Sequence, residues 1–585
     1  MTEQSDQVVE EAGLKVPMRD GTLLDAVVWR PAAPGRYPVL IERSPYEPIW
    51  RTRDNGLFYA RHGYAVVGQS VRGTFASEGS FAPGRDDGWG TNQDGYDTVE
   101  WAAAQPWSSG QVGMLDGSYS GMTQYRVVPT RPPHLRALFV RQGGADARDD
   151  IVFLWPSNPG GAHQLAPART LIVHGLVRPQ LGKRPGLLSA PETRLRVEQA
   201  VEAFDRELWQ LPLKSWPLAA GLADWYREGL DHPDDGPYWA ESSLSQVVAE
   251  IDTPILHLTS WYDCFANGVI RAFTGIRAHG RTAACREAQR LIVGPWIHGA
   301  PNVGQRQVGE IDYGPDAAFD LHDWRLRWYD HWLKGARTDI MNGPPVRICL
   351  MGTNRWLGLQ DWPPADVTYR PLHLAGGTEA GRGRLTFDAL PADDPPDSFQ
   401  YDPDEPVPSM VVEAEVAPID RQSIEDRVPV YTSEVLTEDL HVVGPLTAVL
   451  HASSSAPDTD WVVRLCDVWP DGRSIFISDG ILRARYRDSQ TDPSLLEPGR
   501  VYRFTVTMRP TAQTFRAGHR LRVHVTSSDF PRYDRNLNTG GRFGEESSWN
   551  VATNTVYHDA LRPSHLLLPT MSDQAVEASL IAPPG

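Results

Sequence analysis

Short runs of apolar residues alternate with a longer amphipathic pattern in the first third of the chain. Residues 37–41 and 65–68 are continuous apolar runs, which are typical of strands buried on both faces. Residues 94–105 have the spacing of a helix that ends before a proline. Further apolar runs follow at 112–115 and 135–140. Strands that alternate with helices predict a doubly wound sheet of mainly parallel strands.

The pattern changes between residues 146 and 240, where Pro and Gly separate helical stretches such as 192–208. We interpret this segment as a helical cap inserted over the sheet. The apolar runs return at 254–258 and 290–294, and an aromatic-rich helix is expected over 317–333. The α/β domain is therefore expected in two parts, at residues 1–145 and 241–345.

Residues 346–585 alternate between apolar and polar positions in the manner of β-strands. The expected strands include residues 442–443, 447–451, 460–468, 501–508 and 521–526, with Gly and Pro turns between them. Several short strands at this spacing predict a C-terminal β-sandwich of jelly-roll type.

Composition excludes several classes of partner. The chain of 585 residues has a formal net charge of −18 and no long basic run, so we expect no nucleic-acid partner and no anionic membrane surface. No run approaches the roughly 18 apolar residues of a membrane span. The polar, acidic first residues lack the pattern of a signal peptide, and the four cysteines are scattered without metal-site spacing. We expect a cytoplasmic protein without a metal or organic cofactor.

Residues 112–121, Val-Gly-Met-Leu-Asp-Gly-Ser-Tyr-Ser-Gly, have the order of a nucleophile elbow: strand, tight turn with a serine, then helix. Ser118 and Ser120 compete for the role, because neither fits the strict five-residue pattern. A helix N-terminus behind the serine would favour a developing oxyanion. Asp116 stands where the first glycine of the pattern is usual, and the pattern itself explains no carboxylate there.

Two later strand ends carry the residues that a catalytic serine requires. Asp263 follows the apolar run 254–258, and His298 follows the run 290–294. Catalytic groups collect beyond the carboxyl ends of parallel strands, and the chain order Ser, Asp, His is that of an α/β-hydrolase. The imidazole would take the proton of the serine, and the carboxylate would orient the imidazole. Alone, Asp263 would be interpreted as a turn residue and His298 as a loop histidine.

The chain resembles the family of cocaine-esterase-like and X-Pro dipeptidyl-peptidase-like serine hydrolases. The motifs that carry the resemblance cover nearly the whole chain and lie at residues 16–22, 43–46, 69–73, 77–79, 261–263, 294–298, 330–335 and 530–536. The resemblance implies an α/β-hydrolase sheet with an inserted helical cap and a C-terminal β jelly-roll domain.

The resemblance also assigns roles at the elbow. The nucleophile of the family is followed by tyrosine, with glycine three residues after the serine, which selects Ser118 over Ser120. It places the oxyanion hole at the backbone N–H of Tyr119 and the hydroxyl of Tyr46. Ser70 departs from the aspartate that the family often has before its Arg-Gly, and we expect this change to affect the support of a loop.

The substrate pocket is less well defined by the sequence. Family members that bind a free α-amino group tend to have carboxylates where this chain has Phe265 and Ala266. Phe265 and Trp155 of the cap instead suggest an apolar acyl or aryl pocket, with ordinary core packing as the alternative. Nearby, Asp146, Asp149 and Asp150 are expected in a solvated loop, with negative charge near the cap entrance as the alternative.

We expect a serine hydrolase that cleaves a small ester or amide through an acyl-enzyme. An acyltransferase, an X-Pro dipeptidyl-peptidase or other peptidase, and a non-catalytic binding protein on the same fold stay open. Glycan binding by the β domain and a homodimer are also left open.

Overall fold

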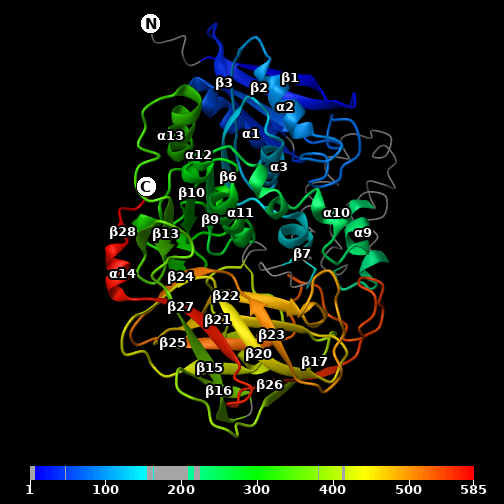
Figure 1. Ribbon diagram of the computed structural model, residues 1–585, viewed down its shortest axis with the longest axis vertical. Helices are drawn as coiled ribbons and strands as arrows, with labels where there is room; N and C mark the ends of the chain where they lie inside the picture. The colour runs from blue at the N-terminus through cyan, green and yellow to red at the C-terminus, as the bar shows by residue number, and fades with distance from the viewer. Residues whose placement is uncertain are drawn as a thin grey trace.

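The computed structural model describes residues 7–46, 48–154, 162–163, 208–215, 224–379, 381–411 and 416–584. A mixed sheet with helices on both faces forms one end of the molecule, and a β-rich domain (β15 to β27, residues 368–571) forms the other (Figure 1). None of the helices in these ranges has both the length and the apolar character that a membrane span requires.

The first sheet has the strand order β1-β2-β4-β3-β5-β6-β9-β10-β13-β14-β28. The strands from β4 to β13 run parallel, and the strands at both edges pair antiparallel. Their bounds are β1 (Val8–Pro17), β2 (Leu23–Pro31), β3 (Tyr37–Ser44), β4 (Ala65–Ser70), β5 (Ser108–Met114), β6 (Leu135–Arg141), β9 (Ile255–Ser260), β10 (Arg290–Gly294), β13 (Val346–Leu350), β14 (Arg355–Leu359) and β28 (Leu580–Ile581). The apolar runs of the sequence therefore predict the strands of the parallel sheet up to β10 correctly.

Helices cover both faces of this sheet, as the sequence predicts. Leu40 of β3 packs in one buried cluster, whereas its neighbours Val39 and Ile41 pack in another on the opposite face. The helices are α1 (Pro48–Arg61), α2 (Asp94–Ala103), α3 (Tyr119–Val127), α11 (Ala266–His279), α12 (Ala283–Ala288) and α13 (Leu321–Lys334). The α/β-hydrolase arrangement is confirmed.

The helix expected from residue 317 begins four residues later, as α13. The carboxylate of Asp320 accepts a hydrogen bond from the N–H of Asp323 and caps the helix, which sets its first turn. Gly335 ends it in the left-handed conformation, with φ of 67°.

The first sheet continues past residue 345, where the second part of the α/β domain was expected to end. β13 pairs in parallel with β10, and β14 then pairs with both β13 and β28. Figure 1 shows the C-terminal segment returning to this sheet. β28 is thus the outer strand at this edge of the sheet, paired with β14.

The cap expected at residues 146–240 lies largely outside the described residues. Within it the structure describes short pieces, among them α9 (Asp224–Asp231), α10 (Pro237–Ala240), β7 (Phe153–Leu154) and β8 (Ala162–His163).

The β-rich domain joins thirteen strands of the described residues in one hydrogen-bonded network. Their bounds are β15 (Thr368–Glu379), β16 (Arg382–Thr386), β17 (Asp397–Tyr401), β18 (Val430–Ser433), β19 (Leu440–Gly444), β20 (Thr447–Ser454), β21 (Asp460–Val468), β22 (Ser474–Arg483), β23 (Tyr502–Thr507), β24 (Thr511–Phe515), β25 (Arg520–Thr526), β26 (Ala552–Tyr557) and β27 (His565–Met571). Phe476 and Ala512 of this domain belong to the same buried cluster as Trp261 and Tyr262 of the first. An apolar core thus runs through the junction next to Asp263.

Candidate active site

The segment after β5 is a strained turn that ends at Ser118, the residue before α3. Ser118 has φ of 58° and ψ of −125°, which is an uncommon backbone conformation for any residue other than glycine. A Cβ atom at Gly117 would lie 2.2 Å from the carbonyl oxygen of Arg141, and one at Gly121 would lie 3.0 Å from Gly143. The small residues of the motif are therefore required by the close approach of the backbone to β6.

Asp116 forms ion pairs on the buried side of this turn. Its φ is 81°, and its Oδ1 lies 2.8 Å from Arg325 of α13 and 3.1 Å from Arg141 of β6. Both arginines are 1 % exposed, so each needs a counter-charge. The carboxylate that the motif does not explain is thus the shared partner of two buried guanidinium groups that lie far away in the sequence.

The side chains of Ser118, His298 and Asp263 form one chain of hydrogen bonds. The Oγ of Ser118 lies 3.1 Å from Nε2 of His298, and Nδ1 of His298 lies 2.8 Å from Oδ1 of Asp263. Asp263 is 1 % exposed, whereas the side chain of His298 is 18 % exposed. An imidazole between a hydroxyl and a carboxylate can move a proton to and from the hydroxyl oxygen. Ser120 is fully buried, and its hydroxyl donates to Glu42 at 3.4 Å.

The Asp263 loop is held from both domains. Within the first domain, the Thr259 hydroxyl donates to Oδ2 of Asp263 at 2.6 Å. From the β-rich domain, Nη1 of the buried Arg509 donates to the carbonyl oxygens of Asp263 at 3.3 Å and of Tyr262 at 3.5 Å. Arg509 is not predicted by the sequence, because no local motif marks a side chain that binds a distant loop.

The two groups assigned to an oxyanion hole come from the start of α3 and from the segment after β3. Tyr119 is the first residue of α3, so its N–H has no acceptor inside the helix. Its side chain is buried, which raises the pKa of its phenol well above the usual value. Tyr46 follows β3, is half-buried and packs against the cluster of apolar side chains that includes Tyr119.

The ring of Phe265 lies beside the imidazole of His298. Its ring is 5.3 Å from the imidazole of His298, centroid to centroid, at an interplanar angle of 73°, and it is 6 % exposed. This edge-to-face contact is compatible with both interpretations of Phe265, pocket wall and core packing. Trp155, the other expected pocket residue, lies outside the described residues.

The acidic segment after β6 is buried, so the expectation of a solvated loop is wrong for most of it. Asp146 and Asp150 are 3 % and 1 % exposed, and Arg271 of α11 lies 2.7 Å and 3.0 Å from their carboxylates. Burial raises the pKa of Asp150 to about 6, although Arg271 opposes this shift. The guanidinium that draws these carboxylates inside is supplied by a distant helix, which the local sequence could not show.

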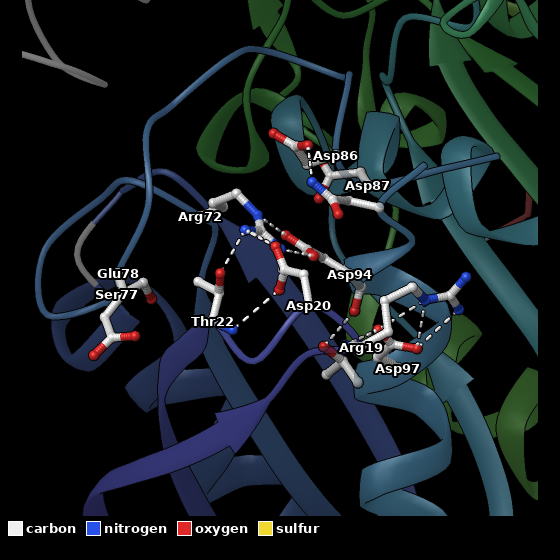
Figure 2. Close-up of polar contacts among 12 residues, drawn as sticks. Arg19, Asp20, Thr22, Arg72, Ser77, Glu78, Asp86, Asp87, Asp94 and Asp97 are labelled. Atoms are coloured by element: carbon white, nitrogen blue, oxygen red, sulfur yellow. Dashed lines mark hydrogen bonds and ion pairs between the residues drawn. The ribbon is translucent and has the colours of Figure 1, made fainter. Parts of the chain in front are cut away.

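A second ionic network supports the loop that begins at Val71. Figure 2 shows Arg72 between the carboxylates of Asp94 and Asp20, with shortest distances of 2.6 Å and 2.7 Å. Hydrogen bonds from Arg72 lower the pKa of Asp20 to about 2, whereas burial raises the pKa of Asp94. Directly before this loop, the carbonyl oxygen of Ser70 accepts a hydrogen bond from the hydroxyl of Ser77 at 2.7 Å. This loop leads to Gly84, whose N–H donates to the phenol of Tyr119 at 3.4 Å.

Among the described residues, one group of side chains places potential metal ligands together: Asp263, Cys264 and His298, with ligand atoms within 4.8 Å of one another. Two of these three residues already bond to each other in the hydrogen-bond chain with Ser118.

The sheet, the serine turn and the late strand ends define an α/β-hydrolase. Comparison with protein families agrees: residues 20–300 match the X-Pro dipeptidyl-peptidase (S15) family. Residues 338–567 match the C-terminal non-catalytic domain of X-Pro dipeptidyl-peptidase. The chain is 35 % identical to cocaine esterase of Rhodococcus sp. (strain MB1 Bresler), over 95 % of this chain and 98 % of that protein.

Two solved structures share the arrangement over nearly their whole length. An alpha-amino acid ester hydrolase superposes with a TM-score of 0.78 and 25 % identity, covering 97 % of this chain and 98 % of that one. An aminopeptidase from the marine sediment archaeon Thaumarchaeota archaeon has a TM-score of 0.79 at 24 % identity, with 98 % of both chains covered. The protein belongs to the cocaine-esterase-like and X-Pro dipeptidyl-peptidase-like family of serine hydrolases, as the resemblance predicts. It is a hydrolase, and its relatives support action on esters.

Proposed function

We propose that the protein hydrolyses small acyl or aryl-acyl esters through a covalent acyl-enzyme on Ser118. The observation that carries the proposal is the continuous chain of hydrogen bonds from Ser118 through His298 to Asp263, at 3.1 Å and 2.8 Å. The relative named cocaine esterase supports an ester as the substrate class.

In the proposed first step, Oγ of Ser118 bonds to the carbonyl carbon of the ester while Nε2 of His298 takes the hydroxyl proton. The carbonyl π electrons move to oxygen, and we propose that this oxyanion receives hydrogen bonds from the Tyr119 N–H and the Tyr46 hydroxyl. The tetrahedral carbon then expels the alkoxide, which takes the proton from His298 and leaves as an alcohol. Asp263 holds the Nδ1–H tautomer and stabilises the imidazolium throughout.

In the second step, His298 takes a proton from water as the water oxygen bonds to the acyl carbon. Collapse of this second tetrahedral species breaks the bond to Oγ of Ser118. The proton returns to the serine, and the free acid is released. An alcohol or amine in place of water would give acyl transfer, so partition between water and an added alcohol distinguishes the two reactions.

Phe265 supports an apolar acyl pocket over a site for a free α-amino group. Family members that bind a free α-amino group tend to have a carboxylate at this position, whereas here a phenyl ring lies 5.3 Å from the imidazole of His298, centroid to centroid. We propose that Trp155 of the cap contributes to the same pocket. Aryl esters should therefore be cleaved faster than amino-acid esters or X-Pro dipeptide amides when the three are assayed side by side.

A fluorophosphonate probe and mass spectrometry test the nucleophile. Wild type should gain one adduct, on the tryptic peptide that contains Ser118, and should lose esterase activity in proportion. Ser118→Ala should give no adduct and no turnover, whereas the matched variant Ser120→Ala should keep both. An adduct that survives Ser118→Ala, or a folded Ser118→Ala protein that is still active, would overturn the assignment.

A further inference from the structure

Gln142 lies where the three segments of the proposed triad come together. It follows Arg141, the last residue of β6, and it is fully buried. Its φ of 49° lies in the left-handed region, which is uncommon for a residue with a side chain. Strain of this kind persists only where the surrounding contacts impose it, and it is concentrated at functional sites.

The main chain of Gln142 connects the nucleophile to the strand of the acid. Its carbonyl oxygen accepts a hydrogen bond from the N–H of Ser118 at 3.0 Å, and its N–H donates to the carbonyl of Leu258 in β9 at 2.7 Å. Asp263 follows the end of β9, so the backbone of one residue connects the serine turn to the strand that precedes Asp263.

The side chain of Gln142 holds the loop of the base on both sides. Nε2 donates to the carbonyl oxygen of Ile297 at 2.9 Å, and Oε1 accepts from the N–H of Gly299 at 2.9 Å. These two residues flank His298. Nε2 also donates to the hydroxyl of Ser260, the last residue of β9, at 2.8 Å.

An amide is the side chain that these contacts require. Oε1 also accepts from Nη1 of Arg141 at 2.9 Å, so the two donors and the two acceptor sites of the amide are all used. A carboxylate of the same length could not donate to Ile297, and a thioether could neither donate there nor accept strongly from Gly299. The orientation of the amide follows from its partners: the nitrogen must face the carbonyl of Ile297, and the oxygen must face the N–H of Gly299.

We propose that Gln142 is a positioning residue of the esterase reaction, which fixes His298 between Ser118 and Asp263. This inference rests on the proposed function, because it assumes that these three residues carry the chemistry. Gln142 contacts both backbone neighbours of His298 and the N–H of Ser118, and it is neutral. It can therefore fix the direction of the imidazole without favouring either of the charge states through which His298 passes in each turnover.

Gln142→Met is the first test, because methionine has a similar length and volume but loses the amide contacts. We expect kcat to fall about 10- to 100-fold, because a displacement of about 1 Å in a preorganised active site lowers the rate by about this factor. KM should change less than threefold, and phosphonylation of Ser118 should slow in parallel with kcat. A folded Gln142→Met protein with kcat within twofold of wild type would overturn the proposal.

The pH–rate profile separates a positioning role from a purely structural one. In Gln142→Met the looser contact of His298 with Asp263 should move the acid limb of kcat to lower pH, since the imidazolium is less stabilised. In Gln142→Glu the added negative charge should move the same limb to higher pH. A limb that stays at the wild-type pH in both variants would argue against the proposal.

Gln289→Met is the matched control. Gln289 is also fully buried, and its amide donates to the carbonyls of Cys285 at 2.8 Å and Thr253 at 3.2 Å. It precedes β10, at the end of the strand away from His298. This control should lose thermal stability while the folded protein keeps wild-type kcat and pH profile; a loss of kcat equal to that of Gln142→Met would contradict the special role of Gln142.

If Gln142→Met yields no folded protein, Ser260→Ala carries the test, because it removes one partner of the amide and little volume. It should lower kcat a few-fold and shift the acid limb in the direction expected for Gln142→Met; wild-type values of both would overturn the proposal. Failure of the proposed function looks different: Ser118→Ala would then remain active. Inactive Ser118→Ala together with normal Gln142→Met would reject the role of Gln142 alone.

Discussion

The buried polar groups around Gln142 differ in kind from those inside the β-rich domain. Around Gln142 the side-chain partners are the hydroxyl of Ser260, the backbone groups of Ile297 and Gly299, and one guanidinium group, that of Arg141. In the β-rich domain, by contrast, buried guanidinium groups pair with buried carboxylates. The two networks approach each other at the Asp263 loop, which Arg509 contacts from the β-rich side.

The ionic network keeps its charges in place. Burial alone would raise the pKa of Asp479, but Arg532 and Arg509 lower it to about 2. Groups held in this way stay charged across the physiological pH range and keep a fixed geometry. They are suited to a scaffold, whereas the proposed mechanism requires His298 to gain and lose a proton.

The neutral network has the opposite property. Amide and hydroxyl groups orient their partners by direction and distance, and they add no net charge to either protonation state of His298. Asp263 is the charged group that faces the imidazole, and its carboxylate is the one that the proposed mechanism needs. The contacts of Gln142 with the segment that carries His298 are thus neutral, whereas its one charged partner, Arg141, pairs with Asp116 on the buried side of the serine turn.

Replacing Asp263 should have the largest effect, because it removes the charge that the proposed mechanism places against His298. In Asp263→Asn the side chain cannot stabilise the imidazolium, and its amide can turn the imidazole to the wrong tautomer. We expect kcat to fall about 10⁴-fold. Steady-state kinetics on an aryl ester would check this result, together with a melting temperature close to that of wild type.

The matched comparison is Thr259→Val, which removes only the hydroxyl that donates to Oδ2 of Asp263 at 2.6 Å. It should reduce kcat about tenfold, corresponding to roughly 1.4 kcal/mol for one hydrogen bond to a charged group. An Asp263→Asn enzyme within tenfold of wild type would show that the carboxylate is not the partner of the base.

The parts of this site that the sequence predicts are those marked by a local pattern. The serine turn follows an apolar run, and Asp263 and His298 follow two others, so the end of each strand locates its residue. The same runs predict the parallel sheet, because a strand buried on both faces must be continuously apolar.

The parts that the sequence does not predict depend on pairs of residues that are distant along the chain. Gln142, Arg325 and Arg271 carry no local motif, and each acquires its role only when folding brings its partner near. Asp146 and Asp150 were expected in solvent for the same reason: a carboxylate is interpreted as exposed until its buried counter-charge is known.

His558 tests the buried ionic contacts of the β-rich domain, because we expect its charge to stabilise that domain. The buried imidazole lies 3.0 Å from Asp394 and 3.1 Å from Asp397. Burial would lower the pKa of His558, but the two carboxylates raise it above the usual value. A pKa raised by folding stabilises the protein fully below about pH 6.5, and the contribution is lost as the pH rises through the folded pKa.

His558→Gln should therefore lower the melting temperature more at pH 6 than at pH 9. At pH 6 we expect a decrease of about 4 to 8 °C, for roughly 2 kcal/mol in a domain of this size. Differential scanning calorimetry at both pH values would measure it. The kcat of the folded variant should equal that of wild type, and an equal decrease at both pH values would show that the imidazole acts as a neutral group.

Arg509 should produce the smallest effect, since it belongs to the ionic network and yet touches the Asp263 loop. Its Nε lies 3.3 Å from Asp479, and its Nη1 lies 3.3 Å from the carbonyl oxygen of Asp263. Arg509→Met should lower the melting temperature, and it should also reduce kcat about threefold, because the loop loses one of several supports. Thermal unfolding and steady-state kinetics on the same preparation would measure both.

Arg464 provides the matched control for the Arg509 prediction. It is a buried arginine of the same network, 3.3 Å from Asp529, and it contributes none of the hydrogen bonds that the β-rich domain makes to the Asp263 loop among the described residues. Arg464→Met should therefore destabilise the protein as Arg509→Met does while kcat stays at the wild-type value. If both variants lose kcat equally, the β-rich domain supports the site only through its overall stability. If Arg509→Met alone loses kcat, a domain whose family match is to a non-catalytic module helps to place the acid of the triad.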